Sequence, residues 1–217
     1  MRKQEFDTLH NTERRADMEV YIIRHGQTDW NIVKKMQGTE DIPLNDTGRE
    51  QALICARALS EIPFEAIYTS PLSRALETAQ IISNYKCHAS VIACQGLIER
   101  DFGEASGMTY EQMHATYPEY PRILPQGMEA FDTLSERVFT SVLDCTKKHR
   151  GKPILLVSHG ASINAILHRV SGGTCGTGIT WLKNTCISKL EYAADSDSFS
   201  LIFHNLSPEE FANGNMI

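Results

Sequence analysis

Short apolar segments alternate with helical patterns along most of this chain, and this alternation restricts the folds open to it. Strand-like runs are predicted at residues 19–23, 66–69, 90–93, 153–158, 186–191 and 199–203. Strands separated by helices are typical of an α/β fold with a mostly parallel sheet. A short polar turn joins the last two runs, which predicts an antiparallel hairpin at one edge of that sheet.

The starts of two helices are marked by capping signals. Thr47 followed by Glu50 predicts an N-cap with a capping box. Ser70 followed by Pro71 predicts a second N-cap with proline at the first helical position. Between residues 131 and 145 the apolar side chains recur at helical spacing, which predicts a third helix.

A chain of 217 residues is long enough for one domain with a modest elaboration. We expect a polar extension over residues 1–17 and a single domain over residues 18–217. Residues 104–130 interrupt the alternation with three prolines, three tyrosines and only a short helical pattern. Loops of this length are usually functional or disordered, and the aromatic content favours a lid-like insertion.

Composition narrows the possible partners. A formal net charge of −6 and a pI near 5.7 argue against a nucleic-acid partner, which calls for a basic face. No apolar run approaches the roughly 20 residues of a membrane span. The six cysteines are scattered without a C-x-x-C pair, so the sequence favours a reduced cytoplasmic protein and gives little support to a zinc site.

Five polar residues are predicted to meet at one edge of the sheet. Arg24 and His25 follow the first strand, His159 follows the fourth, Arg74 lies in a first helical turn, and Glu99 comes shortly after the third strand. In open α/β sheets, ligands bind beyond the carboxyl ends of the strands. Each residue alone has an ordinary structural explanation, whereas convergence of all five at one edge favours a functional site.

These residue types suit the chemistry of phosphate. Two guanidinium groups and a helix N-terminus attract an anion, and the geometry of arginine matches phosphate oxygens. A neutral imidazole in that setting can attack phosphorus. A carboxylic acid can protonate the leaving alkoxide and later activate water. This set of groups needs no metal, because arginine and histidine can stabilise the charge on the transferred group.

The ordered motifs resemble the histidine phosphatase superfamily, also called the phosphoglycerate mutase-like family, from Met18 to about Asn205. The matching segments, in chain order, are Arg24-His25-Gly26-Gln27-Thr28 with Asn31, Gln37-Gly38, Leu44 with Gly48-Arg49-Glu50-Gln51-Ala52, Ser70-Pro71-Leu72-Ser73-Arg74-Ala75 with Thr78-Ala79, Glu99 with Phe102-Gly103, Gly127 with Glu129, and Ser158-His159-Gly160.

The resemblance implies a three-layer α/β/α sandwich with a six-stranded, mostly parallel sheet and an antiparallel edge strand. It implies that His25 is the phosphorylated nucleophile and that Glu99 is the proton donor and acceptor. The phosphoryl-binding residues implied are Arg24, Arg74 and His159, assisted by Asn31. The other substrate-binding residues implied are Gln27, Thr28, Gln37, Gly38 and Gly160. No metal or cofactor is implied.

The resulting hypothesis is a metal-independent phosphatase that releases inorganic phosphate from a small phosphorylated metabolite. An alternative is a mutase that depends on 2,3-bisphosphoglycerate, because the segment Glu99-Arg100 with Phe102-Gly103 resembles the corresponding segment of such mutases. The shorter chain favours the phosphatase, although Ala105-Ser106-Gly107 replaces an aromatic-Glu-Gly run frequent in family phosphatases. A non-catalytic phosphate-binding module is a third possibility, which retention of Glu99 disfavours. The hairpin edge also offers a surface for a homodimer.

Overall fold

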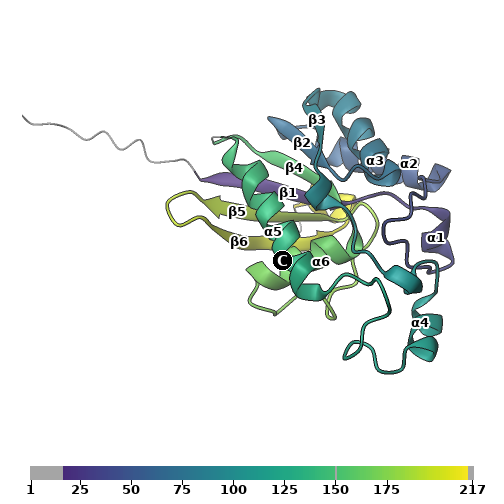
Figure 1. Ribbon diagram of the computed structural model, residues 1–217. Helices are drawn as coiled ribbons and strands as arrows, with labels where there is room; N and C mark the ends of the chain where they lie inside the picture. Colours follow the sequence, from purple (N-terminus) through teal and green to yellow (C-terminus); the bar gives the residue numbers. More distant parts are fainter. Residues whose placement is uncertain (1–16, 150, 215–217) are drawn as a thin grey trace, which may run out of the picture.

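The computed structural model describes residues 17–149 and 151–214, and only the backbone at residues 86 and 87. The predicted N-terminal extension lies outside the described residues, apart from residue 17. A six-stranded sheet in the order β3-β2-β4-β1-β5-β6 forms the centre of the fold (Figure 1). Its strands are β1 (Met18–Arg24), β2 (Ala66–Thr69), β3 (Ser90–Ala93), β4 (Ile154–Ser158), β5 (Ile187–Ala193) and β6 (Ser198–Leu206).

The predicted fold class is confirmed. Strands β3, β2, β4 and β1 pair in parallel, and antiparallel pairing is confined to β5, which runs against both β1 and β6. The hairpin β5–β6 forms one edge of the sheet, as its short connecting turn predicted. All six predicted strands are present in the sheet, with ends shifted by a few residues at most.

Helices cover both faces of the sheet, which gives three layers (Figure 1). On β1, Val20 and Ile22 face the core formed with α5 and α6, whereas Tyr21 and Ile23 face the core formed with α2 and α3. This alternation follows from the two-residue period of a strand. The helices are α1 (Asp29–Ile32), α2 (Asp46–Ala58), α3 (Ser73–Ile82), α4 (Tyr110–Thr116), α5 (Phe131–Lys147), α6 (Gly160–Val170) and α7 (Pro208–Ala212). Among the described residues, no helix has the length and hydrophobicity that a membrane crossing requires.

The predicted start of α2 is wrong by two residues. Asn45, not Thr47, is the N-cap, and its side chain accepts a hydrogen bond from the amide of Gly48 at 2.9 Å. The amide of Asn45 in turn donates to the carbonyl of Gln27 at 3.1 Å. Both Asn and Thr suit an N-cap, so this contact with a distant loop selects Asn45.

The predicted start of α3 is also wrong. The helix begins at Ser73, and Ser70 instead accepts a hydrogen bond from the amide of Leu72 at 3.3 Å. The amide of Ser73 donates to the carboxylate of Asp41 at 2.7 Å. A side chain from another loop thus satisfies the first turn of α3, and the local sequence contains no signal for it.

The insertion, residues 104–130, lies beyond the carboxyl ends of the strands and carries α4 (Figure 1). It has a small core of its own around Ala105, Met113 and Met128. A bridge between Phe102 and Met128 closes its base. Its function as a lid stays a prediction.

A close backbone contact fixes the loop after β1. A Cβ atom added to Gly26 would lie 2.9 Å from the carbonyl carbon of Gly48, and one added to Gly48 would lie 2.7 Å from the amide nitrogen of Gln27. Contacts this short leave no room for a side chain on either residue. The two glycines therefore let α2 rest directly on the loop that begins at His25.

Replacing Gly48 with alanine is expected to destabilise the protein by about 1–3 kcal/mol, because the new methyl group overlaps the backbone of Gln27. In an ordinary helix the same change stabilises by roughly 0.5–1 kcal/mol. Urea unfolding measures the difference, with the exposed Glu50→Ala on the same helix as control. A Gly48→Ala protein as stable as the wild type would contradict the close contact.

Candidate active site

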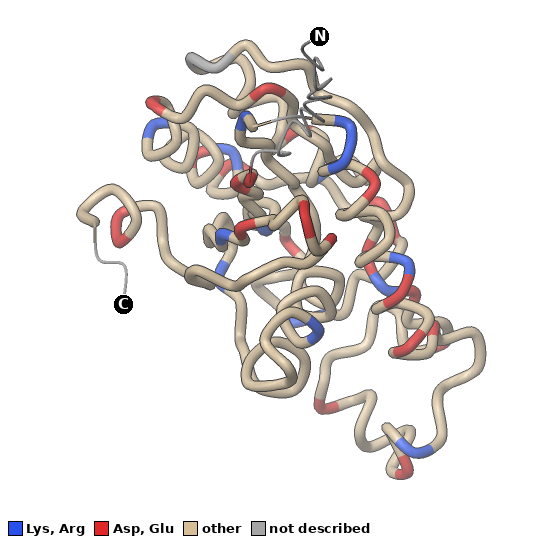
Figure 2. The backbone as a smooth tube through the Cα atoms, turned by 90° about the vertical axis from the view of Figure 1, so that its left-hand side faces the viewer, with Lys and Arg blue, Asp and Glu red and all other residues tan. Residues whose placement is uncertain are grey.

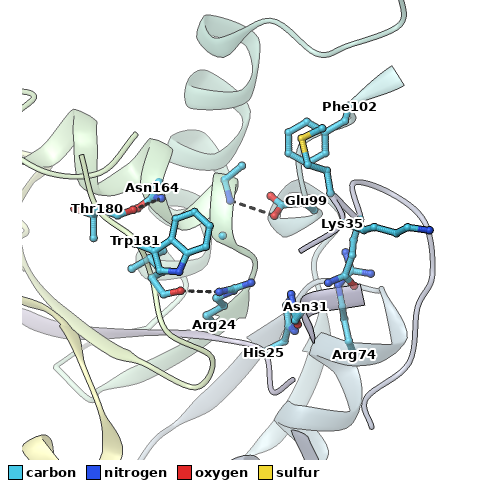
Figure 3. Close-up of a pocket in the computed structure, with 15 residues that line it drawn as sticks. Arg24, His25, Asn31, Lys35, Arg74, Glu99, Phe102, Asn164, Thr180 and Trp181 are labelled. Atoms are coloured by element: carbon cyan, nitrogen blue, oxygen red, sulfur yellow. Dashed lines mark hydrogen bonds between the residues drawn. The ribbon is translucent and has the colours of Figure 1, made fainter. Parts of the chain in front are cut away.

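The structure brings all five predicted catalytic residues together at the carboxyl edge of the sheet. β1 and β4 are neighbours with Arg24 opposite Ser158, so His25 and His159 follow side by side, and their ring centroids are 5.1 Å apart. Arg24, His25, Arg74 and Glu99 line one cavity of about 200 Å³ (Figure 3). His159 is fully buried beside it.

His25 presents a neutral ring with one free nitrogen. Its Nδ1 lies 2.6 Å from the carbonyl oxygen of Gly26. A carbonyl only accepts, so Nδ1 carries the proton and the lone pair is on Nε2. Burial lowers the pKa of His25 well below its ordinary value, and the charges of Arg74 and Arg24 lower it further. The ring therefore stays uncharged at neutral pH, and Nε2 is free to act as a nucleophile.

His159 has the opposite tautomer. Arg74 Nε donates to His159 Nδ1 at 3.2 Å, and because a guanidinium only donates, the proton of His159 is on Nε2. This buried N–H has no hydrogen-bond partner among the described residues. Burial, followed by the charge of Arg74, lowers the pKa of His159 well below its ordinary value. His159 is thus a neutral donor without an acceptor.

Arg74 is wholly buried and is held by backbone oxygens. Its Nη1 donates to the carbonyl of Glu40 at 2.6 Å, and its Nη2 donates to the carbonyl of Gly38 at 2.8 Å. Gly38 has φ +55°, a conformation that glycine adopts readily. Burial lowers the pKa of Arg74 to about 10, so the guanidinium remains charged at neutral pH.

Arg24 supplies the second guanidinium. Its Nη1 donates to the carbonyl of Leu182 at 2.6 Å, whereas its buried Nε–H has no partner among the described residues. Burial lowers the pKa of Arg24 from its ordinary value. Unsatisfied buried donors are rare and costly. Two of them, on Arg24 and His159, indicate a site built for an anionic acceptor.

Glu99 is anchored at the start of α6. Its carboxylate accepts hydrogen bonds from the backbone amides of Arg100, Ala161 and Ser162 at 2.9, 3.1 and 3.0 Å. The positive end of the α6 dipole favours a carboxylate there. A Cβ on Gly160 would lie 3.8 Å from both Glu99 Oε2 and Arg24 Nε, so these two groups flank the glycine beside the cavity.

The predicted substrate-binding residues divide into two groups. Asn31, Gln37 and Gly160 line the cavity, whereas Gln27, Thr28 and Gly38 do not. Gln27 Oε1 accepts from Asn45 at 3.2 Å, and Thr28 is the buried N-cap of α1. Gly38 contributes its carbonyl to Arg74. These three residues lie outside the lining of the cavity, and their contact with substrate stays a prediction.

Sequence reasoning missed one wall of the cavity. That wall consists of Lys35, Met36, Phe102, Ala161, Asn164, Thr180, Trp181 and Leu182. Three of these residues, Thr180, Trp181 and Leu182, belong to the loop that follows the glycine-rich segment 171–178. An exposed tryptophan directly after that segment was the available signal, because Trp181 is 79% exposed and isolated exposed tryptophans often mark binding surfaces.

Asn184 was also missed. Its side-chain amide donates to the carbonyl of His25 at 3.0 Å and to Asn31 Oδ1 at 3.3 Å. Asn184 therefore joins the backbone of His25 to Asn31 of the cavity wall. Nothing in the local sequence distinguishes it from an ordinary loop asparagine.

The site is locally positive within an acidic protein. Acidic residues are spread along many helices and loops of the chain rather than collected in one segment (Figure 2). The cavity, by contrast, is lined by the buried Arg74 and the half-buried Arg24. A low-dielectric pocket strengthens their attraction for an anion. Within the described residues, no group of three or more His, Cys, Asp or Glu side chains could hold a metal ion.

The buried histidines predict a loss of stability in mild acid. Their folded-state pKa values are depressed, so below about pH 6.5 the unfolded chain binds protons that the folded chain does not. Each histidine then contributes a fall of about 1.4 kcal/mol in unfolding free energy per pH unit. Urea titrations at pH 7.5, 6.5 and 5.5 measure the fall, which should be shallower in His25→Asn. Equal falls in both proteins would show that the pKa of His25 is not depressed in the folded protein.

Comparisons with known proteins agree with this geometry. The sequence profile of the histidine phosphatase superfamily (branch 1) matches residues 20–205. A Bacillus subtilis (strain 168) protein described as "Uncharacterized phosphatase PhoE" is 39% identical over 176 residues, 81% of this chain and 89% of that protein. A metal-independent phosphoserine phosphatase of Arabidopsis thaliana is 33% identical over 164 residues, 70% of this chain and 68% of that protein.

Solved structures share the fold as well. Bacillus stearothermophilus YhfR superposes with a TM-score of 0.76 at 26% sequence identity, covering 85% of this chain and 95% of that chain. The family indicated by the ordered motifs is confirmed. The chain belongs to the histidine phosphatase superfamily (branch 1) and is an enzyme for which the phosphatase activity of that family is supported.

Proposed function

We propose that this enzyme hydrolyses small phosphate monoesters through a phosphohistidine formed on His25, without a metal ion. The observation that carries the proposal is the pair of buried, unsatisfied donors, Arg24 Nε and His159 Nε2. A phosphoryl group beside His25 would accept from both and would lie between the guanidinium groups of Arg24 and Arg74. The names of related phosphatases support the same class of reaction.

In the first step, His25 Nε2 attacks phosphorus, the P–N bond forms, and the P–O bond to the leaving alcohol breaks. Glu99 in its protonated form gives a proton to the leaving oxygen and becomes a carboxylate. The hydrogen bond from His25 Nδ1 to the carbonyl of Gly26 orients the ring and stabilises the positive charge that develops on it. Arg24, Arg74 and His159 stabilise the transferred oxygens.

In the second step, the Glu99 carboxylate takes a proton from water, whose oxygen attacks phosphorus. The P–N bond breaks, inorganic phosphate is released, and His25 and Glu99 return to their starting protonation states. The backbone amides that hold Glu99 keep one carboxylate in place for both proton transfers. A mutase would use the same intermediate but return the phosphoryl group to a second hydroxyl group.

His25→Ala should reduce phosphate release by about 10⁴-fold or more, because it removes the nucleophile. The assay measures inorganic phosphate released in EDTA from a panel of monoesters that includes 3-phosphoglycerate with and without 2,3-bisphosphoglycerate. His204→Ala, on the distant strand β6, is the matched control and should keep wild-type activity. Turnover in His25→Ala would exclude the phosphohistidine. Isomerisation that depends on the bisphosphate, with little phosphate release, would establish the mutase.

Glu99→Gln should slow the hydrolysis of alkyl phosphates by about 10²–10⁴-fold, because their alkoxide leaving groups need a proton. Nitrophenyl phosphates, whose leaving groups are good without protonation, should be affected much less in the step that forms phosphohistidine. Pre-steady-state release of nitrophenol isolates that step from the later hydrolysis. Equal losses on both substrate classes in this step would remove Glu99 from the role of general acid.

A further inference from the structure

A second, larger cavity adjoins the catalytic one. Its volume is about 380 Å³, within the range typical of small-molecule sites. It shares part of its wall with the catalytic cavity, and the shared residues are Phe102, Ala161, Asn164, Thr180 and Trp181. A molecule bound at His25 therefore has room to extend past these residues into the second cavity.

The second cavity is lined largely by apolar side chains, of which several are aromatic. Those not shared with the catalytic cavity include Tyr110, Tyr120, Phe131, Leu134 and Ile179. Two of them are held by His114, whose ring centroid lies 4.8 Å from Tyr110 and 5.8 Å from Tyr120. Aromatic walls of this kind bind flat apolar groups through offset and edge-to-face contacts.

One side chain in this apolar setting is charged. Arg100 lines the cavity and is only 6% exposed. Its Nε donates to the carbonyl of Glu129 at 2.8 Å and its Nη1 donates to the hydroxyl of Tyr120 at 3.3 Å. No described residue accepts from its Nη2. The nearby carboxylate of Glu129 is already paired with Arg137 at 2.8 Å.

Arg100 thus lacks a carboxylate partner among the described residues, although charged side chains this deeply buried are usually paired. It is also next to Glu99 in sequence but points the other way. Glu99 is held at the start of α6, whereas Arg100 reaches the insertion through Tyr120. The chain therefore directs the acid group to the catalytic cavity and the cation to the second one.

We propose that the second cavity is a leaving-group subsite for an alcohol with a flat apolar body that ends in a carboxylate, which Arg100 binds. This inference rests on the proposed function, because the phosphoryl end of the same molecule is placed at His25. The aromatic wall contacts the body of the leaving group, and the free Nη2 edge of Arg100 donates to its carboxylate. Charge-assisted bonds of this kind are among the stronger ones in proteins.

Binding of the product alcohol tests the subsite without any turnover. Calorimetry compares 6-hydroxy-2-naphthoate with 2-naphthol, which share one body and differ in the carboxylate. We expect the carboxylate to bind about tenfold tighter or more in the wild-type protein. Arg100→Met should abolish the difference, Arg100→Lys should retain part of it, and Arg122→Met, which changes an arginine on the same insertion that is exposed, should preserve it.

Turnover tests the same preference in the reacting molecule. The ratio of kcat/KM for 6-carboxy-2-naphthyl phosphate to that for 2-naphthyl phosphate is measured in each variant. Comparing this preference between the wild type and each variant cancels the intrinsic reactivity of the two esters. We expect the preference for the carboxylated ester to fall about tenfold in Arg100→Met and to stay unchanged in Arg122→Met.

Each outcome decides between the two proposals. Equal affinity for the two naphthalenes in the wild-type protein overturns the subsite, whatever the activity. If the carboxylate binds more tightly and this requires Arg100, but no ester is hydrolysed, the subsite is supported and the proposed function fails. If the esters are hydrolysed through His25, but the carboxylated ester gains nothing from Arg100, the function is supported and the subsite is overturned. If Arg100→Met fails to fold, Arg100→Lys and the wild-type comparison still decide.

Discussion

The placement of two arginine side chains, Arg74 buried at the start of α3 and Arg24 half-buried at the end of β1, is the constraint on which the site depends. Arg74 has no exposure and is held mainly by the carbonyls of Gly38 and Glu40. Carbonyl dipoles offset only part of the several kcal/mol that burying a charge costs. The charges of Glu99 and Asp41 supply further stabilisation, since both raise the pKa of Arg74. An anion in the cavity would offset more of the cost of burying this charge.

The neutral state of both histidines follows from burial and from the same charges. Burial lowers the pKa of His25 and His159, and the nearby charges of Arg74 and Arg24 lower both values further. Hydrogen bonds then assign the tautomers, with Gly26 fixing the proton of His25 on Nδ1 and Arg74 fixing that of His159 on Nε2. One imidazole is left with a lone pair and the other with an N–H. Two histidines thus offer different groups to the cavity, a lone pair at His25 and an N–H donor at His159, because their neighbours differ.

The sequence predicted the strands and the five converging residues because both depend on local pattern and on the geometry of parallel sheets. Apolar runs identify the strands, and the carboxyl ends of parallel strands meet at one edge. The starts of α2 and α3 were wrong because their caps are selected by contacts with Gln27 and Asp41, which lie on other loops. No local pattern in the sequence indicates that Arg100 turns inward, where its side chain is only 6% exposed.

Under the two proposals, Glu99 takes part in the reaction and the neighbouring Arg100 takes part in the choice of substrate. Glu99, His25 and Arg74 are fixed by β-strand ends and helix starts that belong to the central fold. The insertion contributes Tyr110 and Tyr120 to the second cavity, and its core around Met113 is separate from the two cores that pack on the sheet. Changes at Tyr110, which bonds to none of the catalytic groups, can therefore reshape the second cavity without moving them. Tyr120 and Glu129, by contrast, are linked to Glu99 through Arg100. On this argument, the shape of the leaving group is set by the insertion, and the chemistry of phosphate is set by the sheet.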